Sequence, residues 1–592
     1  MCGILGTNFY SNNFKEALEN LNNRGPDFNC HVEVGGANFG HTRLSIIDLD
    51  KEANQPMVFD DILIVFNGEI YNYKELIDEE KLICKTSSDT EVIIRLYQKY
   101  KEDFLNKLNG MFSFCIYNMK EKSFFCARDR YGKKPFFYYF KENKFIFSSS
   151  INSIIKILGT TPSINKVAIS QYMQYFVPLE DNTFYKDINA LEASYYMVFD
   201  GKTITKKRFY KINTYKKIKD EKEALLGIEE LLFKSVESRL VSDVEVGSLL
   251  SGGIDSSLIS ALYSKITNKR INTFSIGYKE YKNYCELDYA KITSKHINSL
   301  HTPVEIGKDD FINNLEDTIE ALEQPHGDSA AIPLNILTKK IHSLGIKTVL
   351  SGEGSDELFL GYDNYAKFLK YYEFEKTLSD EQNSFLDSII SALQNNTKES
   401  EYLRRIIKKQ NLYNSFGEVF TDIQKKKLFK KVPTFKSDSP KKDPVDWMSY
   451  IDLKIWLGEA LLSKVDRISM RNSLEVRTPF LDYRLVNYMF SIDSNIKVGD
   501  TNKYLLKKIA SKYIPNEIIN RTKKGFNSPF NEWIHEEYKD SILELILRVN
   551  KNTNFFNDEY LKQIYELSKK RKFKQHLWSL FVFSKWYDKI YL

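Results

Sequence analysis

The sequence predicts an α+β fold for the N-terminal third, followed by a doubly wound α/β fold with a helical C-terminal part. Up to about residue 200, short apolar runs are separated by Gly, Asn and Asp, which indicates antiparallel sheets with covering helices. From about residue 222, helical stretches alternate with short apolar strands, which is typical of a parallel sheet. We therefore expect two domains, over residues 1–210 and 211–592.

The N-terminal elements follow from alternation and from the turn residues between them. The expected strands cover residues 62–66, 112–117, 123–127, 135–140 and 144–148, and a helical period covers 90–100. Residues 203–222 are polar and basic, so we expect them to connect the two domains.

In the second domain the expected elements alternate in type. Helices are expected over 223–239 and 257–266, and strands over 247–250, 271–278, 302–306 and 347–350. Beyond about residue 365 the chain is mostly helix-periodic and charged. The Lys-rich stretch 424–442 is expected to be a loop, with Lys425 to Lys427 as solvated surface.

The composition is that of a globular protein and excludes several classes. The chain has 592 residues, 42% of them hydrophobic and 28% charged, and a net charge of +6. This charge is too dilute to predict nucleic-acid binding, and no apolar run reaches the roughly 18–20 residues that a membrane helix needs. The six cysteines form no CxxC pair, so we expect reduced thiols in the cytoplasm and no zinc ribbon.

The second residue is a cysteine, and removal of Met1 would make it the N-terminus. Cys2 would then carry both a thiol and a free α-amine, so that nucleophile and base belong to one residue. The unperturbed pKa of an α-amine is about 7.7–8.0, which suits proton transfer at neutral pH. The alternative is a small apolar residue at the start of a strand, with Met1 retained.

The most specific motif is SGGIDSS at residues 251–257, directly after the strand expected over 247–250. Paired glycines let the backbone approach a phosphate closely, and the N-terminus of the next helix adds N–H donors. Asp255 is placed to bind a Mg²⁺ ion that bridges phosphates. No GxxxxGK[ST] motif occurs, which favours release of whole pyrophosphate over γ-phosphoryl transfer. The alternative is a plain strand-to-helix turn with Ser as the N-cap.

A second loop of the same kind, SGEGSDE at residues 351–357, follows the strand expected over 347–350. In an open parallel sheet, strand ends meet at the carboxyl edge, where ligands bind. Asp356 is then placed to share a metal ion with Asp255. The alternative is an acidic helix start favoured by the helix dipole.

Four motifs together resemble glutamine-hydrolysing asparagine synthetase. SGGIDSS resembles the pyrophosphate loop of the ATP-pyrophosphatase (PP-loop) families, and FSIGY at 274–278, SGEGSDE at 351–357 and SLEVRTPFLD at 473–482 accompany it. The resemblance extends from Cys2 to about Phe526. It implies that the C-terminal domain activates a carboxylate by attack on the α-phosphate of ATP, and that ammonia then displaces AMP to give an amide.

The resemblance also implies roles for residues of the C-terminal domain. The implied ATP-binding residues are Leu250, Ser251, Gly252, Gly253, Asp255, Ser256, Ile276, Ser351 and Gly352, and the implied Mg²⁺ ligands are Asp255 and Asp356. Glu353 lies where the family has a carboxylate that orients or deprotonates the incoming ammonia. Lys523 matches a lysine that faces the α-phosphate, with its neighbour Lys524 and a plain surface role as alternatives.

Two structural roles are open for three residues near the end of the matching region. Asp466, Glu475 and Arg477 are expected either to form or buttress the acceptor pocket, or to be buried ion-pair scaffolding.

The first 150 residues are similar to the glutaminase half of the same family, which is of the N-terminal-nucleophile hydrolase type. The matching pieces, in order, are MCGI at 1–4, RGPD at 24–27, HTRLS at 41–45, NGEIYN at 67–72 and SSDTE at 87–91. By this resemblance Cys2 carries a glutamyl thioester, and the Asn67 side chain and the Gly68 N–H form the oxyanion hole.

The resemblance further implies that glutamine is bound by Arg43, Asn67, Glu69 and Asp89. Arg43 would take the α-carboxylate and Asp89 the α-ammonium. The alternatives are a surface ion pair for Arg43, a helix cap for Asp89 and a hairpin turn at 67–68.

As a whole, the resemblance implies a glutamine-dependent asparagine synthetase with glutamine, aspartate and ATP as substrates and Mg²⁺ as cofactor. It also implies an internal ammonia channel and a homodimer. The dilute charge and the lack of a long apolar run predict neither a nucleic acid nor a membrane as partner. The acceptor stays open, because EQPHGDS at 323–329 departs from the Asp-Glu-Pro and apolar stretch of many relatives. A relative that amidates another carboxylate, such as a sugar uronate in surface-polysaccharide synthesis, is the first alternative.

Three further alternatives are a ring-closing relative, a non-catalytic homologue and a tRNA-modifying PP-loop enzyme. The presence of Cys2 argues against the first, and the presence of Cys2, Asp255 and Asp356 argues against the second. The lack of a basic binding domain argues against the third.

Overall fold

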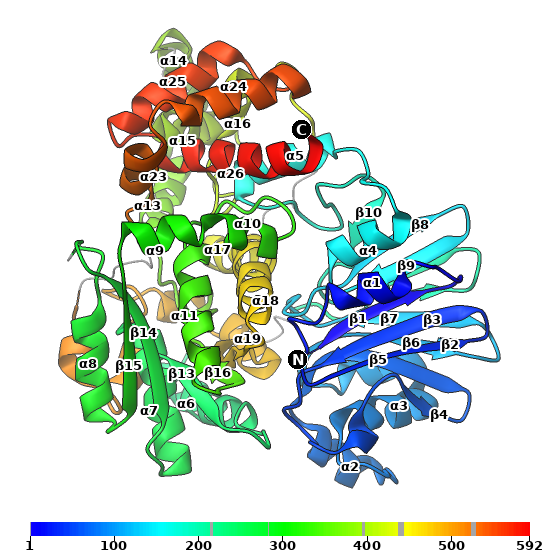
Figure 1. The fold of residues 1–592 in the computed structure, drawn as a ribbon. Helices are drawn as coiled ribbons and strands as arrows, with labels where there is room; N and C mark the ends of the chain where they lie inside the picture. The colour runs from blue at the N-terminus through cyan, green and yellow to red at the C-terminus, as the bar shows by residue number, and fades with distance from the viewer. Residues whose placement is uncertain (1, 213–216, 282, 394–396, 436–442, 522–527) are drawn as a thin grey trace.

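The computed structural model describes residues 2–212, 217–281, 283–393, 397–435, 443–521 and 528–592, except for the side chains of 391–393. Figure 1 shows the strands of the N-terminal part, blue to cyan, beside the green sheet of the C-terminal part. The orange-red and red helices near the C-terminus lie above the green sheet. Among the described residues, no helix is long and apolar enough to cross a membrane.

Two antiparallel sheets make up the N-terminal part. Their strands are β1 (Gly3–Thr7), β2 (Phe28–Val34), β3 (Ala37–Arg43), β4 (Met57–Phe59), β5 (Ile62–Ile70), β6 (Gly110–Asn118), β7 (Ser123–Arg128), β8 (Phe137–Lys141), β9 (Lys144–Ser148), β10 (Ile188–Ala190), β11 (Tyr195–Phe199) and β12 (Ile204–Arg208). One sheet has the order β10-β8-β9-β1-β3-β2, and the other has the order β12-β11-β7-β6-β5-β4. The predicted α+β class of this part is confirmed.

The two sheets enclose an apolar core, and helices cover their outer faces. Because successive side chains of a strand point to opposite faces, Leu63 and Val65 of β5 enter the core between the sheets, whereas Ile64 and Phe66 enter the core on the other face. Helix α3 (Asp89–Tyr100) packs on that other face, and α1 (Phe14–Glu19) and α4 (Ile151–Leu158) pack on the first sheet. Strand β5 is therefore buried on both faces along its whole length.

One N-terminal expectation is wrong. Residues 204–208 were expected to belong to a connection, but they form β12, which pairs with β11 along its whole length. This strand is at the edge of its sheet and its side chains are half-buried or exposed, so it lacks the apolar alternation that marks the other strands.

A five-stranded parallel sheet lies in the C-terminal part. Its strands are β13 (Val246–Leu249), β14 (Asn272–Tyr278), β15 (Leu300–Ile306), β16 (Thr348–Leu350) and β17 (Glu475–Arg477), in the spatial order β15-β14-β13-β16-β17. All neighbouring strands run parallel, which confirms the doubly wound prediction. The order reverses between β13 and β16, and this is the topological switch point of the sheet. The two Ser-Gly loops follow β13 and β16, so the topology places them side by side.

The remaining elements are helices. They are α2 (Tyr73–Glu80), α5 (Lys166–Tyr175), α6 (Glu221–Ser238), α7 (Ile254–Thr267), α8 (Leu287–His296), α9 (Lys308–Asn313), α10 (Leu315–Ala321), α11 (Ala331–Ser343), α12 (Ser355–Leu358), α13 (Asp363–Thr377), α14 (Asp380–Leu393), α15 (Lys398–Ile407), α16 (Asp422–Leu428), α17 (Pro444–Asp452), α18 (Leu462–Arg471), α19 (Tyr483–Ser491), α20 (Ser494–Lys497), α21 (Tyr504–Ala510), α22 (Asn516–Ile519), α23 (Phe530–Tyr538), α24 (Ser541–Thr553), α25 (Asp558–Lys569) and α26 (Lys574–Tyr591). Short 3₁₀ turns (Lys51–Ala53, Lys101–Asn106, Pro479–Leu481) and one π-helical stretch (Leu453–Leu461) complete the set.

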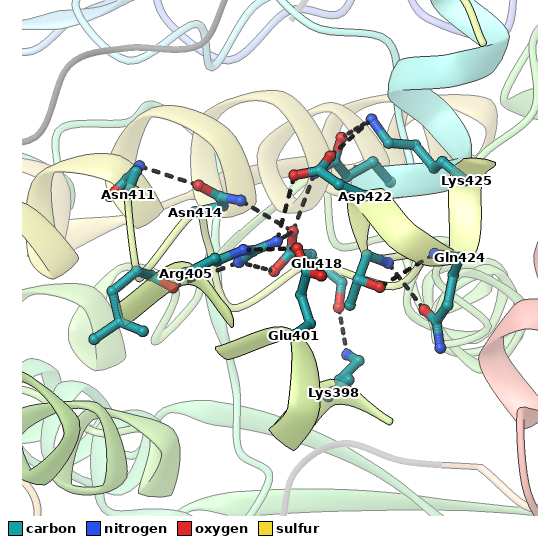
Figure 2. Close-up of polar contacts among 12 residues, drawn as sticks. Lys398, Glu401, Arg405, Asn411, Asn414, Glu418, Asp422, Gln424 and Lys425 are labelled. Atoms are coloured by element: carbon teal, nitrogen blue, oxygen red, sulfur yellow. Dashed lines mark hydrogen bonds and ion pairs between the residues drawn. The ribbon is translucent and has the colours of Figure 1, made fainter. Parts of the chain in front are cut away.

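A buried cluster of charged and polar side chains connects α15, α16 and the loop between them to α5 (Figure 2). Arg405 of α15 donates to both carboxylate oxygens of Glu418, at 2.7 and 2.9 Å. Gln174 of α5 also donates to Glu418, at 3.0 Å, so the cluster joins α15 to a helix much earlier in the chain.

The cluster corrects the expectation for the Lys-rich stretch. Residues 422–428 form α16, which begins with a capping box made by Thr421 and Gln424. Lys425 is 6% exposed and bonds Gln174, so it is buried rather than solvated. Residues 436–442 of this stretch lie outside the described residues.

We expect Arg405→Met to lower the free energy of unfolding of α15 by about 3–5 kcal/mol, because it leaves the Glu418 carboxylate buried without its partner. Hydrogen exchange in α15 under increasing denaturant measures this. A matched change at the exposed pair Lys234–Glu230, Lys234→Met, should cost less than about 1 kcal/mol. Equal effects of the two changes would contradict the argument.

The same pair predicts a pH dependence. Burial opposes ionisation of Glu418, but the Arg405 guanidinium outweighs it and lowers the pKa of Glu418 to about 2. Because the pKa of an unfolded Glu is about 4.3, the stabilisation is present above that pH and is lost as the pH falls from about 4 toward 2.

Candidate functional site

One candidate site surrounds Cys2 at the start of β1. The Cys2 N–H donates to the Asn67 side-chain oxygen at 3.1 Å, and Arg24 donates to the Cys2 carbonyl at 3.1 Å. Cys2 is 7% exposed, and burial raises the pKa of its thiol. A pocket at this point is lined by Cys2, Arg43, Gly68, Glu69, Asp89 and several apolar side chains. The structure thus brings most of the sequence-predicted glutaminase residues together.

Asn67 and Gly68 lie inside β5, so they are not a hairpin turn. A Cβ at position 68 would lie 2.1 Å from the Met111 carbonyl oxygen, which means that only glycine fits. The Asn67 oxygen is held by the Cys2 N–H, whereas among the described residues its nitrogen makes a single long contact, 3.5 Å to the Ser113 hydroxyl. Asn67 and Gly68 therefore present N–H groups beside Cys2.

Arg43 is buried rather than at the surface, with 5% of its area exposed. Its guanidinium donates to the Asp50 carbonyl at 2.9 Å, to the Ile47 carbonyl at 3.3 Å and to the Asn54 side chain at 2.8 Å. These neutral acceptors fix the guanidinium at the pocket without neutralising its charge.

Two carboxylates face the same pocket. Asp89 is the first residue of α3, but the N-cap is Ser88, so capping is not the role of Asp89. Its carboxylate accepts from the Ile70 N–H at 2.9 Å, and burial raises the pKa of Asp89 to about 7. Burial also raises the pKa of Glu69, and the nearby Glu475 adds to this effect. A cationic group entering the pocket would favour the ionised form of both.

The second candidate site lies where the loops after β13 and β16 meet. Gly252 has a φ of +82°, and a Cβ there would lie 2.6 Å from a backbone nitrogen of α8, so this position requires glycine. The hydroxyls of Ser251 and Ser256 are 3.0 Å apart and close the loop. A Cβ on Gly352 would lie 3.0 Å from the Asp255 Cβ, which shows that the two loops are in contact.

The other predicted ATP-binding residues surround these loops. Gly253 is the N-cap of α7, and the Leu250 N–H donates to the Phe274 carbonyl at 2.7 Å. Ile276 is on the adjacent strand β14 and is 8% exposed. The Ser351 N–H donates to the carbonyl of Arg477 in β17 at 2.8 Å.

Lys503, at the start of α21, bridges the two loops. Its ammonium nitrogen lies 2.6 Å from an Asp255 oxygen and 2.7 Å from an Asp356 oxygen. Burial opposes the charge of Lys503, but the two carboxylates outweigh it and raise the pKa of this lysine. The sequence reasoning missed Lys503, because it belongs to a helical segment far along the chain and to no recognised motif.

The same two carboxylates fit a Mg²⁺ ion. They converge on one ammonium nitrogen, so they are close enough to share a cation. Mg²⁺ prefers oxygen ligands and is commonly held by one or two carboxylates together with substrate phosphates. Within the described part of the chain no group of three or more His, Cys, Asp or Glu could hold a metal.

A third set of charges borders the second site. Glu353 follows Gly352; burial raises the pKa of its carboxyl, and the charge of Lys464 opposes this. Lys464 pairs with Asp328 at 2.6 Å. Sequence reasoning missed Lys464, although a signal exists: this lysine lies within the apolar stripe of α18, next to Val465 and four residues before Ile468.

A cavity lies between the two parts of the chain. It is lined by Lys133, Lys134, Leu462, Val465, Asp466, Ser469, Val476 and Thr478. Asp466 pairs with Lys134 at 3.1 Å and with Arg24 at 2.9 Å. Since Arg24 also holds the Cys2 carbonyl, one polar network runs from Cys2 to the wall of the cavity.

Known proteins match the whole chain. The model of the glutamine amidotransferase domain matches residues 1–210, and the asparagine synthase model matches residues 227–588. The chain is 31% identical to asparagine synthetase [glutamine-hydrolyzing] 1 of Bacillus subtilis (strain 168), over 99% of this chain and 96% of that protein. The chain belongs to the glutamine-hydrolysing asparagine synthetase family.

Two further relatives show the range of the asparagine synthetase family. A putative asparagine synthetase of Mycobacterium tuberculosis (strain ATCC 25618 / H37Rv) is 30% identical, over 87% of this chain and 83% of that protein. The amidase chyE of Penicillium rubens is 26% identical, over 92% of this chain and 88% of that protein. Because relatives carry different names, family membership alone does not fix the acceptor.

In this asparagine synthetase family member, Asp466, Glu475 and Arg477 join the two parts of the chain. Arg477 bonds Glu475 at 2.6 Å and lies 3.7 Å from Glu69 in the Cys2 pocket. Asp466 binds Arg24 and Lys134, as described above. The structure therefore supports scaffolding rather than an acceptor pocket, because β17 is the edge strand that borders the N-terminal part.

Lys523 and its neighbour Lys524 lie outside the described residues. The residue before this stretch, Arg521, donates to the Gly252 carbonyl at 3.0 Å.

We expect Lys503→Met to make the protein respond to Mg²⁺ without ATP. In the wild-type protein the Lys503 ammonium is paired with both carboxylates and competes with other cations, so about 10 mM Mg²⁺ should hardly change Tm. In the Lys503→Met variant, Asp255 and Asp356 are neighbouring negative charges with no cation between them. Binding of Mg²⁺ should therefore raise Tm by a few degrees, roughly 2–4 °C for each kcal/mol of stabilisation. Thermal unfolding with and without Mg²⁺ measures this.

The double variant Lys503→Met with Asp255→Asn serves as the control. It should lose the response to Mg²⁺, because one carboxylate is gone. A Mg²⁺ response that is the same in the wild type and in Lys503→Met would contradict the shared-cation geometry.

Proposed function

We propose that the chain is a glutamine-dependent asparagine synthetase, which converts glutamine, aspartate and ATP into asparagine, glutamate, AMP and pyrophosphate. The observation that carries this proposal is the convergence of Asp255 and Asp356 at a sheet switch point, in one chain with a pocket built on Cys2. Membership of the family supports ATP as a substrate. We propose residues 1–210 as the glutaminase domain and 211–592 as the synthetase domain.

In the proposed first reaction, Met1 is removed and the freed α-amine of Cys2 takes the proton of its thiol. The thiolate attacks the side-chain amide carbon of glutamine, and the oxyanion accepts hydrogen bonds from the Asn67 nitrogen and the Gly68 N–H. The carbon–nitrogen bond then breaks, the proton passes to the leaving ammonia, and a glutamyl thioester remains on Cys2. Water hydrolyses this thioester to glutamate.

The pocket charges suit the backbone end of glutamine. Arg43 carries a guanidinium that neutral acceptors among the described residues hold in place, and this charge suits the α-carboxylate. Asp89 and Glu69 are carboxylates whose pKa values are raised by burial, and the α-ammonium would favour the ionised form of both.

In the proposed second reaction, the β-carboxylate of aspartate attacks the α-phosphorus of ATP. The bond to the bridging oxygen breaks, giving β-aspartyl-AMP, and pyrophosphate leaves into the loop of Ser251, Gly252, Gly253 and Ser256, with Ser351 and Gly352 beside it. Mg²⁺ held by Asp255 and Asp356 would neutralise charge on the leaving group. Leu250 and Ile276 would contact adenosine, and Lys503 and Lys523 would add positive charge near the phosphates.

Ammonia completes the reaction by attack on the acyl carbon. Glu353 would accept a proton from it, since burial raises the pKa of this carboxyl toward that of a useful base. AMP then leaves with its phosphate oxygen. We propose the cavity beside α18 as part of the passage that brings ammonia from Cys2.

Three residues of the stretch that departs from the family pattern, Glu323, Gln324 and His326, make contacts that hold the fold together, so their departure does not oppose aspartate as acceptor. Glu323 accepts from the Ile151 N–H at 2.9 Å at the start of α4, and Gln324 accepts from the Phe184 N–H at 3.1 Å. His326 bonds the Ala460 carbonyl at 2.9 Å.

Mass spectrometry of products formed from MgATP, glutamine and aspartate tests the proposal. We expect asparagine, glutamate, AMP and pyrophosphate. Cys2→Ala should abolish use of glutamine but keep synthesis from free ammonia, whereas Asp255→Asn should stop pyrophosphate release and keep glutamine hydrolysis. Glutamate without asparagine in the wild type would reject aspartate and direct the test to uronates.

The pKa of Asp89 predicts how glutamine binding depends on pH. Because Asp89 titrates at about 7 and its ionised form holds the α-ammonium, affinity should be full above that pH and fall by up to tenfold per unit below it. Calorimetric titration of the Cys2→Ala variant with glutamine measures this without turnover. A dissociation constant that stays constant down to about pH 5.5 would contradict this role of Asp89.

A further inference from the structure

A buried ion pair lies just past the two Ser-Gly loops. It joins Lys464 of α18 to Asp328 in the turn before α11, with 2.6 Å between the ammonium nitrogen and a carboxylate oxygen. The side chains are 7% and 16% exposed. The pair is therefore largely removed from bulk water, where a charge is costly unless it is matched.

The position of the pair is at the carboxyl edge of the parallel sheet. Glu353 lies close enough to Lys464 and Asp328, and also to Asp356, for all three charges to act on its carboxyl. Ser329, next to Asp328, lies 3.3 Å from Ser528, hydroxyl to hydroxyl. The pair thus borders the loops on the side where Glu353 lies.

Both members of the pair are held in place yet keep unused hydrogen-bonding capacity. The other carboxylate oxygen of Asp328 accepts from the Ala330 N–H at 3.0 Å, and the Asp328 N–H donates to His326 at 3.2 Å. The Lys464 ammonium has three donors, and among the described residues only Asp328 accepts from it. No described side chain donates to the Glu353 carboxylate.

Helix α18 separates this pair from the cavity between the two parts. The residues after Lys464, namely Val465, Asp466 and Ser469, line that cavity. A molecule bound at the pair is therefore one helix away from the proposed ammonia passage.

We propose that Lys464 and Asp328 form the acceptor subsite and that the acceptor is an α-amino acid, whose α-carboxylate binds Lys464 and whose α-ammonium binds Asp328. This rests on the proposed function, because it assumes that the loops bind ATP. A zwitterion supplies each member of the pair with the opposite charge. A uronate offers one carboxylate and hydroxyls, and would leave the Asp328 carboxylate without a new cation.

Kinetics of synthesis from free ammonia at saturating MgATP test the subsite. Lys464→Met and Asp328→Asn should each raise KM for aspartate by about tenfold to a hundredfold, with KM for ATP changed by less than about twofold. The buried pair Lys497–Asp446, 2.7 Å apart in the same part of the chain, gives matched controls. Lys497→Met and Asp446→Asn should leave KM for aspartate unchanged.

A substrate-side test needs no variant. The wild-type protein should release pyrophosphate with L-aspartate but at least a hundredfold less efficiently with N-acetyl-L-aspartate, which lacks the ammonium, or with D-glucuronate. Equal use of N-acetyl-L-aspartate, or variants with unchanged KM for aspartate, would overturn the subsite while asparagine synthesis still stood. Activation of a different α-amino acid, weakened by both variants, would overturn aspartate as substrate and keep the subsite.

Discussion

The arrangement of the C-terminal site depends on one electrostatic constraint at the sheet switch point. The topology brings the loops after β13 and β16 together, and each loop carries a carboxylate toward the other. Two carboxylates so close repel each other unless a cation lies between them, and Lys503 supplies that cation. The loops therefore keep their geometry in the absence of ligand, and a site that is already arranged loses less entropy when a nucleotide binds.

Helix α18 is the second organising element, because its two sides serve different parts of the proposed reaction. Asp466 forms ion pairs with Arg24 and Lys134 of the N-terminal part, while Lys464 pairs with Asp328 beside Glu353. Successive residues of a helix point in directions about 100° apart, so residues 464 and 466 reach separate surroundings. One rigid element thereby fixes the distance between the cavity and the place where an acyl group would form.

Local sequence patterns predicted the strands and loops that short motifs or hydrophobic periods mark. They did not predict contacts between segments that are distant in the sequence. Four strands of the parallel sheet, β13 to β16, and the two Ser-Gly loops follow from short motifs and hydrophobic periods, and the grouping of Arg43, Gly68 and Asp89 around Cys2 follows from the family resemblance. The fifth strand, β17, was not predicted, because three residues at the edge of the sheet carry too short a signal. The edge strand β12 escaped because it buries little, and Lys425 was misplaced because its burial comes from a partner, Gln174, far away in the sequence. Lys503 escaped for the same reason, since its carboxylate partners belong to two loops that precede it by many elements.

The contact between the two parts of the chain also limits how they can move. Arg477 lies beside Glu69 of the Cys2 pocket, while its carbonyl accepts the Ser351 N–H of the second Ser-Gly loop, so one residue touches the walls of both sites. Around it the contact is made of buried charges, including Glu475, Asp466 and Arg24. Sliding one part past the other would leave such charges unpaired, at a cost of about 3–5 kcal/mol for each broken pair. An interface of this kind favours a fixed register between the two sites, which is what a passage for a small, easily lost intermediate requires.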